Sequence, residues 1–407
     1  MSAVSVNPVD ELRTTAAVRE RAQHLLHRAR AGTSRWFHVD DSALPAAAAR
    51  VTDLTLQRFP DLDIPFHSRW RHFEAGGVDR TATLRARLDA QDRAGQARTM
   101  IDLAVVSVLL DAGAGPGWSY REAGRGQSFA RSEGLGVASW HAFAGGMFSS
   151  DASQPWQADA AGLATLDEDR LAAAFQLSPT NPLVGFQGRV QLLRRLGAAL
   201  AAQPQTFGTP ARPGGLFDVL VAADGTVAAH AILSALLSSL SGIWLANNMI
   251  DGQPIGDCWP HPAVPGRGSS QGWVPFHKLS QWLTYSLLEP FQWAGITVSG
   301  LDALTGLPEY RNGGLFLDTG VLTLRDPSWA SQTWSVGDEM IVEWRALTVA
   351  LLDQVADAVR TRLGVDATQM PLACVLEGGT WAAGRQLAQQ LRGGLPPLTI
   401  SSDGTVF

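Results

Sequence analysis

Three charged residues in one glycine-rich segment have the clearest potential for chemistry. Glu309, Arg311 and Asp318 lie in LTGLPEYRNGGLFLDTG, whose other residues are mostly apolar or glycine. A carboxylate among apolar neighbours can stabilise a developing positive charge or take a proton from water. Glu309 is the candidate for that role. Asp318 is a second carboxylate that could bind ligand hydroxyls, and a turn or helix cap is an equally good interpretation of it.

Lys278 is the cation that could act on Glu309. Its charge could hold the carboxylate ionised or bind an anionic group such as a phosphate, and Arg311 could do the same. The alternative interpretation of the whole segment is an ordinary charged loop. The sequence leaves open whether Lys278 and Glu309 meet in the fold.

The element that must position Lys278 is a helix predicted over residues 275–293. Leu279, Leu283 and Leu287 recur every four residues and form an apolar stripe. A second face collects polar and aromatic residues at helical spacing: Lys278, Gln281, Trp282, Tyr285 and Glu289. Its aromatic residues, with Phe276, would form the wall of a pocket that excludes water. The alternative is a surface helix with snorkelling side chains.

Other segments also carry residues that could bind a ligand. His141 lies in a predicted helix rich in small residues, and Asp151 follows in a polar turn. A lone helical histidine is more often a hydrogen-bonded core residue, and Asp151 suits a turn or cap equally well. Residues 65–74, PFHSRWRHFE, include His67 and could contact a phosphate, but a basic loop fixed by aromatic packing is the favoured interpretation. The glycines near residue 115 do not follow the GxGxxG pattern of dinucleotide sites.

The composition argues against several classes of protein. The 407 residues are 45% hydrophobic and 17% charged, so the chain can bury a large core. The net charge is −6 with scattered Lys and Arg, which argues against nucleic acid as a partner. Cys258 and Cys374 are far apart and no other ligand cluster is visible, so no disulfide framework, metal or cofactor is expected. Without a signal-peptide pattern or a membrane-spanning apolar run, a cytoplasmic protein is expected.

Helical periodicity prevails along the chain and predicts a mostly α fold with a few short strands, such as residues 315–324. Residues 336–364 form the clearest predicted helix, with Glu343 and Arg345 off its apolar face. Residues 247–271 form a long loop containing DCWPHP, which we interpret as a lid or pocket wall because long loops are usually functional. We expect one α-rich domain over residues 1–407, with a helical N-terminal region, 1–80, packed on a core, 81–407.

Five separated motifs resemble the uracil-catabolism (URC-type) family, formerly a domain of unknown function. They are FHKLSQWLTYSLLEP, LTGLPEYRNGGLFLD, VEWRALTVALLD, LEGGTWAAGR and the terminal SDGTVF. The resemblance extends from about residue 8 to the C-terminus. That family is associated with a pathway in which uracil is converted to its ribonucleotide and the ring is opened.

The order of motifs also resembles, more distantly, the queuosine-salvage N-glycosidase family, which is related in fold to helical DNA glycosylases of the helix-hairpin-helix type. In FHKLSQ, Phe276, Lys278 and Gln281 match that family's Phe/Tyr-x-Lys-Arg-Ala-Gln helix start. PEYR stands at its Asp-Tyr-Arg motif, so Glu309 replaces the catalytic Asp and the Tyr-Arg pair is retained. EWRA matches its Glu-x-Arg-Ala helix, and GVASWHAFAGG stands at its helix of small residues. This resemblance implies a large helical domain of the glycosylase kind.

The two resemblances together imply an N-glycoside hydrolase. Positive charge develops at the anomeric carbon during such hydrolysis, and a nearby carboxylate stabilises it. We expect Glu309, Lys278 and Asp318 to be catalytic. The residues expected to bind substrate are Arg311, Tyr310, Gln281, Trp282, Phe276, His277, His141 and Asp151.

The expected substrate is a ribosylurea 5′-phosphate, cleaved to urea and ribose 5-phosphate. One alternative is an amidohydrolase acting on the ring-opened pyrimidine, which would usually use a metal cluster or a nucleophile dyad. Another is a non-catalytic protein that binds or senses a nucleotide of the pathway. The expected partner is a small ribosyl phosphate, with neither nucleic acid nor membrane involved, and the oligomeric state is open.

Overall fold

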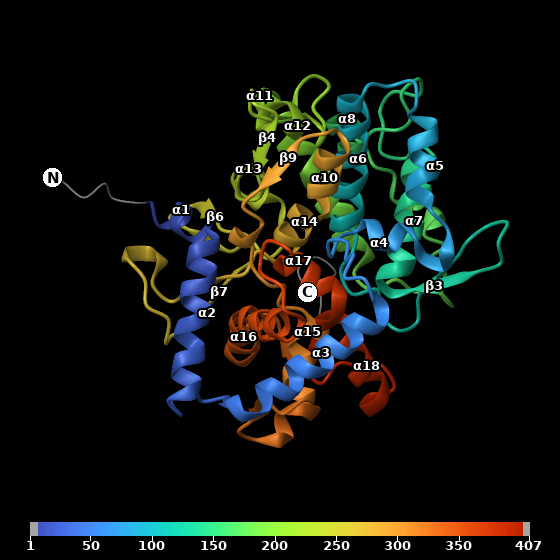
Figure 1. Cartoon of the computed structure of the whole chain (residues 1–407). Coiled ribbons are helices and arrows are strands. Elements are labelled where there is room, and N and C mark those ends of the chain that lie inside the picture. The colour runs from blue at the N-terminus through green and yellow to red at the C-terminus, as the bar shows by residue number, and fades with distance from the viewer. Residues whose placement is uncertain (1–6, 402–407) are drawn as a thin grey trace. The chain divides into compact units, whose positions relative to one another are not determined.

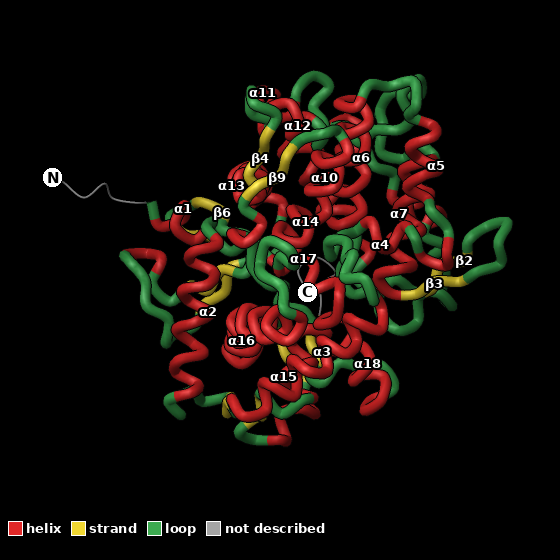
Figure 2. The backbone as a smooth tube through the Cα atoms, viewed as in Figure 1, coloured by secondary structure: helices red, strands yellow, loops and turns green. Residues whose placement is uncertain are grey.

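Helices dominate the computed structural model, which describes residues 7–401 (Figure 2). Within these residues the strands are short and form two-stranded pairs. The prediction of a mostly α fold is confirmed. Among the helices of residues 7–401, none combines the length and the apolar character needed to cross a membrane. The terminal motif SDGTVF, residues 402–407, lies outside the described residues.

The described residues divide into two compact units made of interleaved stretches of chain. Unit 1 contains residues 7–67, 248–281 and 300–401, and unit 2 contains residues 68–247 and 282–299. The N-terminal stretch therefore groups with the C-terminal part of the chain, and the first boundary between the units falls after residue 67. Helix α14 (Lys278–Trp293) begins in unit 1 and continues into unit 2.

Unit 1 is built around helix α16. Besides the first turn of α14, its helices are α1 (Pro8–Leu12), α2 (Thr15–Arg30), α3 (Leu44–Arg58), α15 (Tyr310–Asp318), α16 (Glu339–Leu363), α17 (Leu372–Val375), the π-helix Leu376–Thr380 and α18 (Trp381–Arg392). Its strands are β1 (Phe37–Val39), β5 (Met249–Ile250), β6 (Gln253–Pro254), β7 (Cys258–Pro260), β8 (Trp273–Pro275), β10 (Leu322–Leu324), β11 (Thr333–Ser335) and β12 (Thr399–Ser401). The pairs β1–β10, β5–β6 and β7–β8 are antiparallel, and β11–β12 is parallel.

Unit 2 is also mostly helical, with short paired strands. Besides the rest of α14, its helices are α4 (Trp70–Phe73), α5 (Arg80–Arg87), α6 (Arg93–Leu109), α7 (Arg131–Ala144), α8 (Ala160–Ala164), α9 (Glu168–Ala174), α10 (Phe186–Ala201), α11 (Pro204–Phe207), α12 (Gly215–Leu220) and α13 (Ala229–Leu240). Its strands are β2 (Ser119–Arg121), β3 (Ser128–Ala130), β4 (Thr226–Ala228) and β9 (Thr297–Ser299). β2 and β3 pair antiparallel, and β4 and β9 pair parallel.

Helix α16 forms the core of unit 1. The helix predicted over residues 336–364 is confirmed, and it ends at Gly364, which has a left-handed backbone (φ 69°). Helices α2, α3 and α15 pack around it (Figure 1). Because every residue from 340 to 352 of this helix is buried, Glu343 and Arg345 are buried too, although they lie off the apolar stripe.

Helix α14 is buried from Lys278 to Phe291, so the interpretation of this segment as a surface helix is wrong. The helix begins three residues later than predicted, because Pro275 ends strand β8. Between them His277 adopts a left-handed backbone (φ 49°), which turns the chain from the strand into the helix.

The glycine-rich segment around Glu309, which we interpreted as a charged turn, is largely a helix. Residues 310–318 form α15, and only Leu322–Leu324 of the strand predicted over residues 315–324 is extended. Glycine disfavours helix interiors, but here packing requires it. A Cβ atom at Gly313 would lie 2.7 Å from the indole ring of Trp344 on α16. Tertiary packing therefore overrides the local preference.

A second glycine contact holds α18 against the start of α15. A Cβ atom at Gly384 would overlap the backbone carbonyl oxygen of Arg311. Only glycine permits the two helices to approach this closely, because a neighbouring backbone atom cannot move aside as a flexible side chain can.

Replacing Gly384 by alanine should therefore destabilise unit 1. We expect Gly384→Ala to lower the free energy of unfolding by about 1–3 kcal/mol, since the extra methyl group forces α18 away from α15. Gly314→Ala is the matched control on α15, because the nearest atom to its Cβ is on Pro397 at 3.4 Å, an ordinary contact. It should be neutral or stabilising by up to about 1 kcal/mol. Urea denaturation of both variants measures the difference, and equal stabilities would contradict the close packing.

Candidate functional site

Glu309 is the N-cap of α15, and its carboxylate is fixed by backbone donors. Oε2 accepts from the amide of Arg311 at 2.7 Å, and Oε1 accepts from the amide of Asn312 at 2.5 Å. Burial raises the pKa of Glu309 above its ordinary value, and these two bonds with the charges of Lys278 and Arg311 offset the rise only in part. The preferred N-cap residues are Ser, Thr, Asp and Asn, whose side chains are shorter than that of glutamate. The position therefore holds a rigid carboxylate that is more basic than usual.

Lys278 is the first residue of α14 and only 8% exposed. Its positive charge lowers the pKa of Glu309, so the two side chains are within electrostatic reach of each other. Both residues lie in unit 1, and Lys278 acts on Glu309 through its charge.

A buried ion pair, here called the Asp257–Arg345 anchor, holds the first turn of α14. Arg345 donates from Nη1 to Oδ1 of Asp257 at 2.9 Å and from Nη2 to Oδ2 at 2.7 Å. Oδ2 also accepts from the backbone amide of Lys278 at 3.0 Å, and Oδ1 accepts from the indole of Trp259 at 2.7 Å. Burial alone would raise the pKa of Asp257, but the charge and hydrogen bonds of Arg345 outweigh it and leave that pKa lowered. A fixed negative charge therefore lies at the helix start, where it is favoured.

The anchor also fixes the two residues before Lys278. The backbone amides of Phe276 and His277 donate to the carbonyl of Asp257 at 2.9 and 3.3 Å. The guanidinium carbon of Arg345 lies 4.0 Å from the ring centroid of Phe276. The imidazole of His277 is hydrogen bonded through Nε2 to the carbonyl of Leu12 at 2.9 Å, and burial lowers its pKa. His277, expected to bind substrate, thus takes part in packing between α1 and α14.

Gln281 links α14 to the segment that leads into Glu309. Its Nε2 donates to Oγ1 of Thr305 at 2.6 Å, and the amide of Thr305 donates to its Oε1 at 3.4 Å. Both side chains are fully buried. Gln281, expected to bind substrate, is therefore a brace between the elements that carry Lys278 and Glu309.

Tyr310 and Arg311 follow Glu309 in the first turn of α15. Burial, together with the nearby charge of Glu309, raises the pKa of Tyr310 to about 12, so its hydroxyl stays protonated and can donate a hydrogen bond. The guanidinium of Arg311 donates to the carbonyl of Gly394 at 3.3 and 3.2 Å and adds positive charge near Glu309.

Asp318 is not brought to Glu309. It is the last residue of α15, about 13 Å along the helix axis from Glu309 at the usual rise per residue. Its Oδ2 forms an ion pair with Nη2 of Arg392 at 2.6 Å. Its position and partner indicate that Asp318 fastens α18 to α15.

His141, Asp151 and Trp282 belong to unit 2. His141 is hydrogen bonded through Nε2 to Glu122 at 2.7 Å, and Glu122 also accepts from Arg80. In the same unit, the guanidinium carbon of Arg69 lies 5.5 Å from the ring centroid of Trp282. His141 is therefore hydrogen bonded, as the core interpretation expects, but its side chain is 37% exposed.

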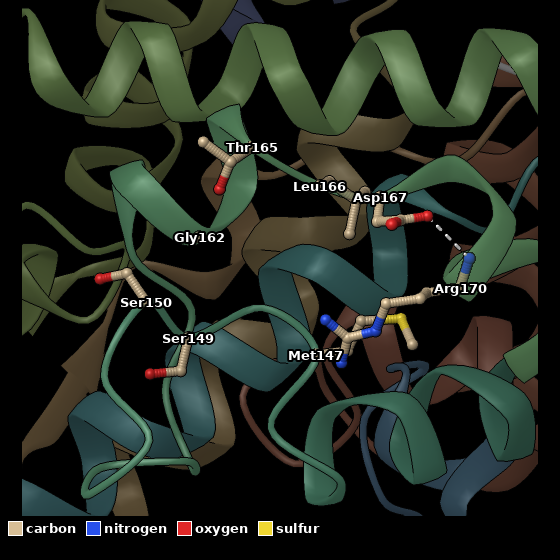
Figure 3. A pocket seen from close by; sticks show the side chains of 8 residues that line it. All are labelled: Met147, Ser149, Ser150, Gly162, Thr165, Leu166, Asp167 and Arg170. Carbon is tan, nitrogen blue, oxygen red and sulfur yellow. Dashed lines mark hydrogen bonds between the residues drawn. The ribbon is translucent and has the colours of Figure 1, made fainter.

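Asp151 forms a surface turn, accepting from the amide and hydroxyl of Ser153 at 2.8 and 2.7 Å. A cavity of about 90 Å³ lies beside this turn. Figure 3 shows the residues that line it: Met147, Ser149, Ser150, Gly162, Thr165, Leu166, Asp167 and Arg170. Ligand sites usually have volumes of about 300–1,000 Å³, so this cavity is too small for a ribosyl phosphate. Asp151 is best interpreted as a turn residue.

Asp257 is a residue of the candidate site that was not predicted from the sequence. Its only signal was its place in the long loop containing DCWPHP, which we interpreted as a lid or pocket wall. In the structure this loop contains strands β5, β6 and β7, with β8 directly after it, and Asp257 immediately precedes β7. Within residues 7–401, no three His, Cys, Asp or Glu side chains are grouped so that they could hold a metal ion.

Breaking the anchor should unfold unit 1 readily. We expect Asp257→Asn to lower the free energy of unfolding by about 3–5 kcal/mol, because Arg345 remains buried without its counter-charge. Asp41→Asn is the matched control, since Arg30 and Asp41 form a similar pair that is largely exposed. It should cost less than about 1 kcal/mol. Urea denaturation compares the variants, and similar losses would show that burial of the anchor is not decisive.

Comparison with known proteins shows similarity over nearly the whole chain. The family model described as "Protein of unknown function (DUF1688)" matches residues 11–407. Protein urg3 of Schizosaccharomyces pombe (strain 972 / ATCC 24843) is 38% identical over 413 residues, covering 99% of this chain and 100% of that protein. Uracil catabolism protein 4 of Lachancea kluyveri is 36% identical over 438 residues, covering 98% of this chain and 99% of that protein. The resemblance to the uracil-catabolism family is confirmed.

Proposed function

We propose a function from the premise that this chain belongs to the family described as "Protein of unknown function (DUF1688)", whose model matches it from residue 11 to residue 407. Its relative from L. kluyveri is named a uracil catabolism protein, and this chain matches that relative along its whole length. The proposed role is therefore in the breakdown of uracil. The proposed reaction is hydrolysis of the N-glycosidic bond of a ribosylurea 5′-phosphate, which yields urea and ribose 5-phosphate.

The observation that carries this proposal is the Glu309 carboxylate. A serine or aspartate would cap α15 without forcing a longer carboxylate into a site that raises its pKa. A raised pKa improves a carboxylate as a base toward water, and a fixed negative charge stabilises an oxocarbenium-like transition state. The position favours both effects, which supports a catalytic role.

The neighbouring residues supply complementary functions. Lys278 lowers the pKa of Glu309 and so favours its ionised form, and with Arg311 it supplies the positive charge that a 5′-phosphate requires. In the proposed reaction the oxygen of a water molecule bonds to C1′ of the ribose while the C1′–N bond breaks. Glu309 accepts the proton of that water, while the electron pair of the C1′–N bond stays with the departing nitrogen, which takes a proton from solvent to give urea. The hydroxyl of Tyr310 stays protonated and can donate a hydrogen bond to a substrate oxygen.

The distant resemblance to the queuosine-salvage N-glycosidases supports the same assignment. In PEYR the glutamate stands where that family has its catalytic aspartate, and FHKLSQ supplies the lysine. The additional methylene of Glu309 moves the carboxylate outward, which suits a differently shaped leaving group. Similarity of the fold to helical DNA glycosylases is part of this proposal.

Product release from a panel of ribosyl compounds tests the activity. We expect ribose 5-phosphate and urea from ribosylurea 5′-phosphate, and no ribose 5-phosphate from UMP or a purine nucleotide. Glu309→Gln should lower kcat at least about 100-fold, because the amide neither takes a proton nor carries charge. Asp302→Asn, an exposed carboxylate of unit 1, is the control and should leave turnover unchanged.

Other outcomes would replace the proposal. Tight binding of one compound without turnover would favour a nucleotide-binding or sensing protein. Ammonia released while the C1′–N bond stays intact would favour an amidohydrolase acting on the opened pyrimidine.

The pH dependence of kcat/KM tests the coupling of Lys278 to Glu309. Activity requires ionised Glu309, so it should be lost as the pH falls through a pKa above the ordinary 4.5 of a glutamate. Lys278 lowers that pKa, so Lys278→Met should move the acidic limb to higher pH. Lys278→Arg retains the charge and should leave the limb in place. An unmoved limb in Lys278→Met would contradict the coupling.

A further inference from the structure

Helix α3 carries an exposed face that the proposed reaction does not use. Its opposite side is buried against α16 and the π-helix Leu376–Thr380. The residues of the exposed face recur at helical spacing, and each is exposed or half-buried: Ala46, Ala49, Arg50, Asp53, Leu54 and Gln57. The helix is therefore amphipathic, with one side in the core of unit 1 and the other toward solvent. We refer to these six residues as the α3 face.

Helix α18 packs beside α3 (Figure 1), and the α3 face lines a groove there together with Gln386 of α18. The groove has a volume of about 390 Å³. Its residues on α3 extend over about 16 Å along the helix axis at the usual rise per residue. Sites for small ligands are usually lined by hydrophobic and aromatic side chains, and none of the described residues that line this groove is aromatic. An elongated polar groove of this kind fits a helix better than a compact ligand.

The centre of the α3 face carries two opposite charges, Arg50 and Asp53. Neither forms an ion pair within residues 7–401, although they are three residues apart on the helix. Nη2 of Arg50 donates to the Oε1 atoms of Gln390 at 2.9 Å and Gln386 at 3.4 Å. These bonds hold the guanidinium beside α18 but do not compensate its charge, because a glutamine side chain is neutral. Both charges can therefore pair with a partner of opposite charge.

The α3 face is complementary to a second copy of itself. Its six residues lie symmetrically about the midpoint of residues 46–57, as helical spacing requires. In an antiparallel pair related by a two-fold axis at that midpoint, Arg50 of each copy lies opposite Asp53 of the other, so the pairing is made twice. Ala49 then lies opposite Leu54, and the small alanine lets the helices approach closely. A parallel pair would instead place like charges opposite each other.

We propose that two copies of this protein associate through antiparallel pairing of their α3 helices, with Arg50 of each copy bound to Asp53 of the other. Leu56 is 43% exposed, lies two helical turns after Ala49 and adds apolar contact at the edge of this interface. A contact between single helices of 15 residues is smaller than the roughly 1,600 Å² of a standard interface. The dimer is therefore weak and concentration-dependent, and it dissociates more readily at high salt, which screens exposed charges.

Charge reversal tests this interface by sedimentation velocity over a range of protein concentrations. Arg50→Glu gives the α3 face two negative charges, and Asp53→Arg gives it two positive charges. Each variant alone should self-associate at least about tenfold more weakly than the unaltered protein, because like charges then oppose each other twice. An equimolar mixture of the two variants should dimerise again, and so should the double variant R50E/D53R.

Asp302→Arg and Arg362→Glu are the matched controls, because they reverse exposed charges of unit 1 outside α3. Neither should change self-association, alone or mixed. If a reversed variant of the α3 face fails to fold, Asp53→Asn takes its place and should still weaken the dimer at least about threefold.

Three results would overturn the inference. Unaltered protein that stays monomeric at every concentration would leave the groove to a different partner. A dimer of unchanged affinity in both reversed variants would place the interface elsewhere on the molecule. Reversed variants that do not associate when mixed would show that the two charges do not pair.

Discussion

The buried charge of Arg345 imposes the constraint on which the candidate site depends. A guanidinium inside the core is tolerated only with a counter-charge and well-made hydrogen bonds. Asp257 supplies both, and its carboxylate also caps the first turn of α14 through the amide of Lys278. The residue that compensates the core charge therefore also places the lysine. A disturbance of the core would be transmitted directly to the site.

Buried charged side chains with several hydrogen-bond partners also hold other parts of the molecule in place. In unit 2, Asp102 is fully buried and accepts from Nε of Arg212 and from the backbone amides of Ala158 and Gly214. One carboxylate thereby ties two loops to α6. In unit 1, Glu343 is buried beside His261 and accepts from the hydroxyl of Ser34. The strands are short and hold few loops in place. Buried charged side chains with several hydrogen-bond partners fix the loops instead.

Glu309 combines a structural role with the chemical role that we propose for it. As a cap it satisfies two amides of α15, and as a carboxylate with a raised pKa it is prepared to accept a proton. The cap accounts for its rigidity, while the raised pKa is a cost that a shorter polar cap would avoid. The close approach of α18 at Gly384 stabilises the same turn from the other side. The proposed chemistry thus uses a position that two helices already hold in place.

The sequence by itself determined the helical character of the chain, the extent of α16 and the choice of Lys278 and Glu309. Hydrophobic periodicity is local, and a charged residue in an apolar segment is conspicuous without any fold. The tertiary structure decided which side chains meet. Asp257 and Arg345 are 88 residues apart, and His67 and Glu377 are 310 apart, so no local pattern could pair them. Likewise the sequence offered Asp318 as a second carboxylate, and only the folded position of Arg392 gave it a different partner. Such pairings depend on how distant helices pack, which periodicity and composition do not encode.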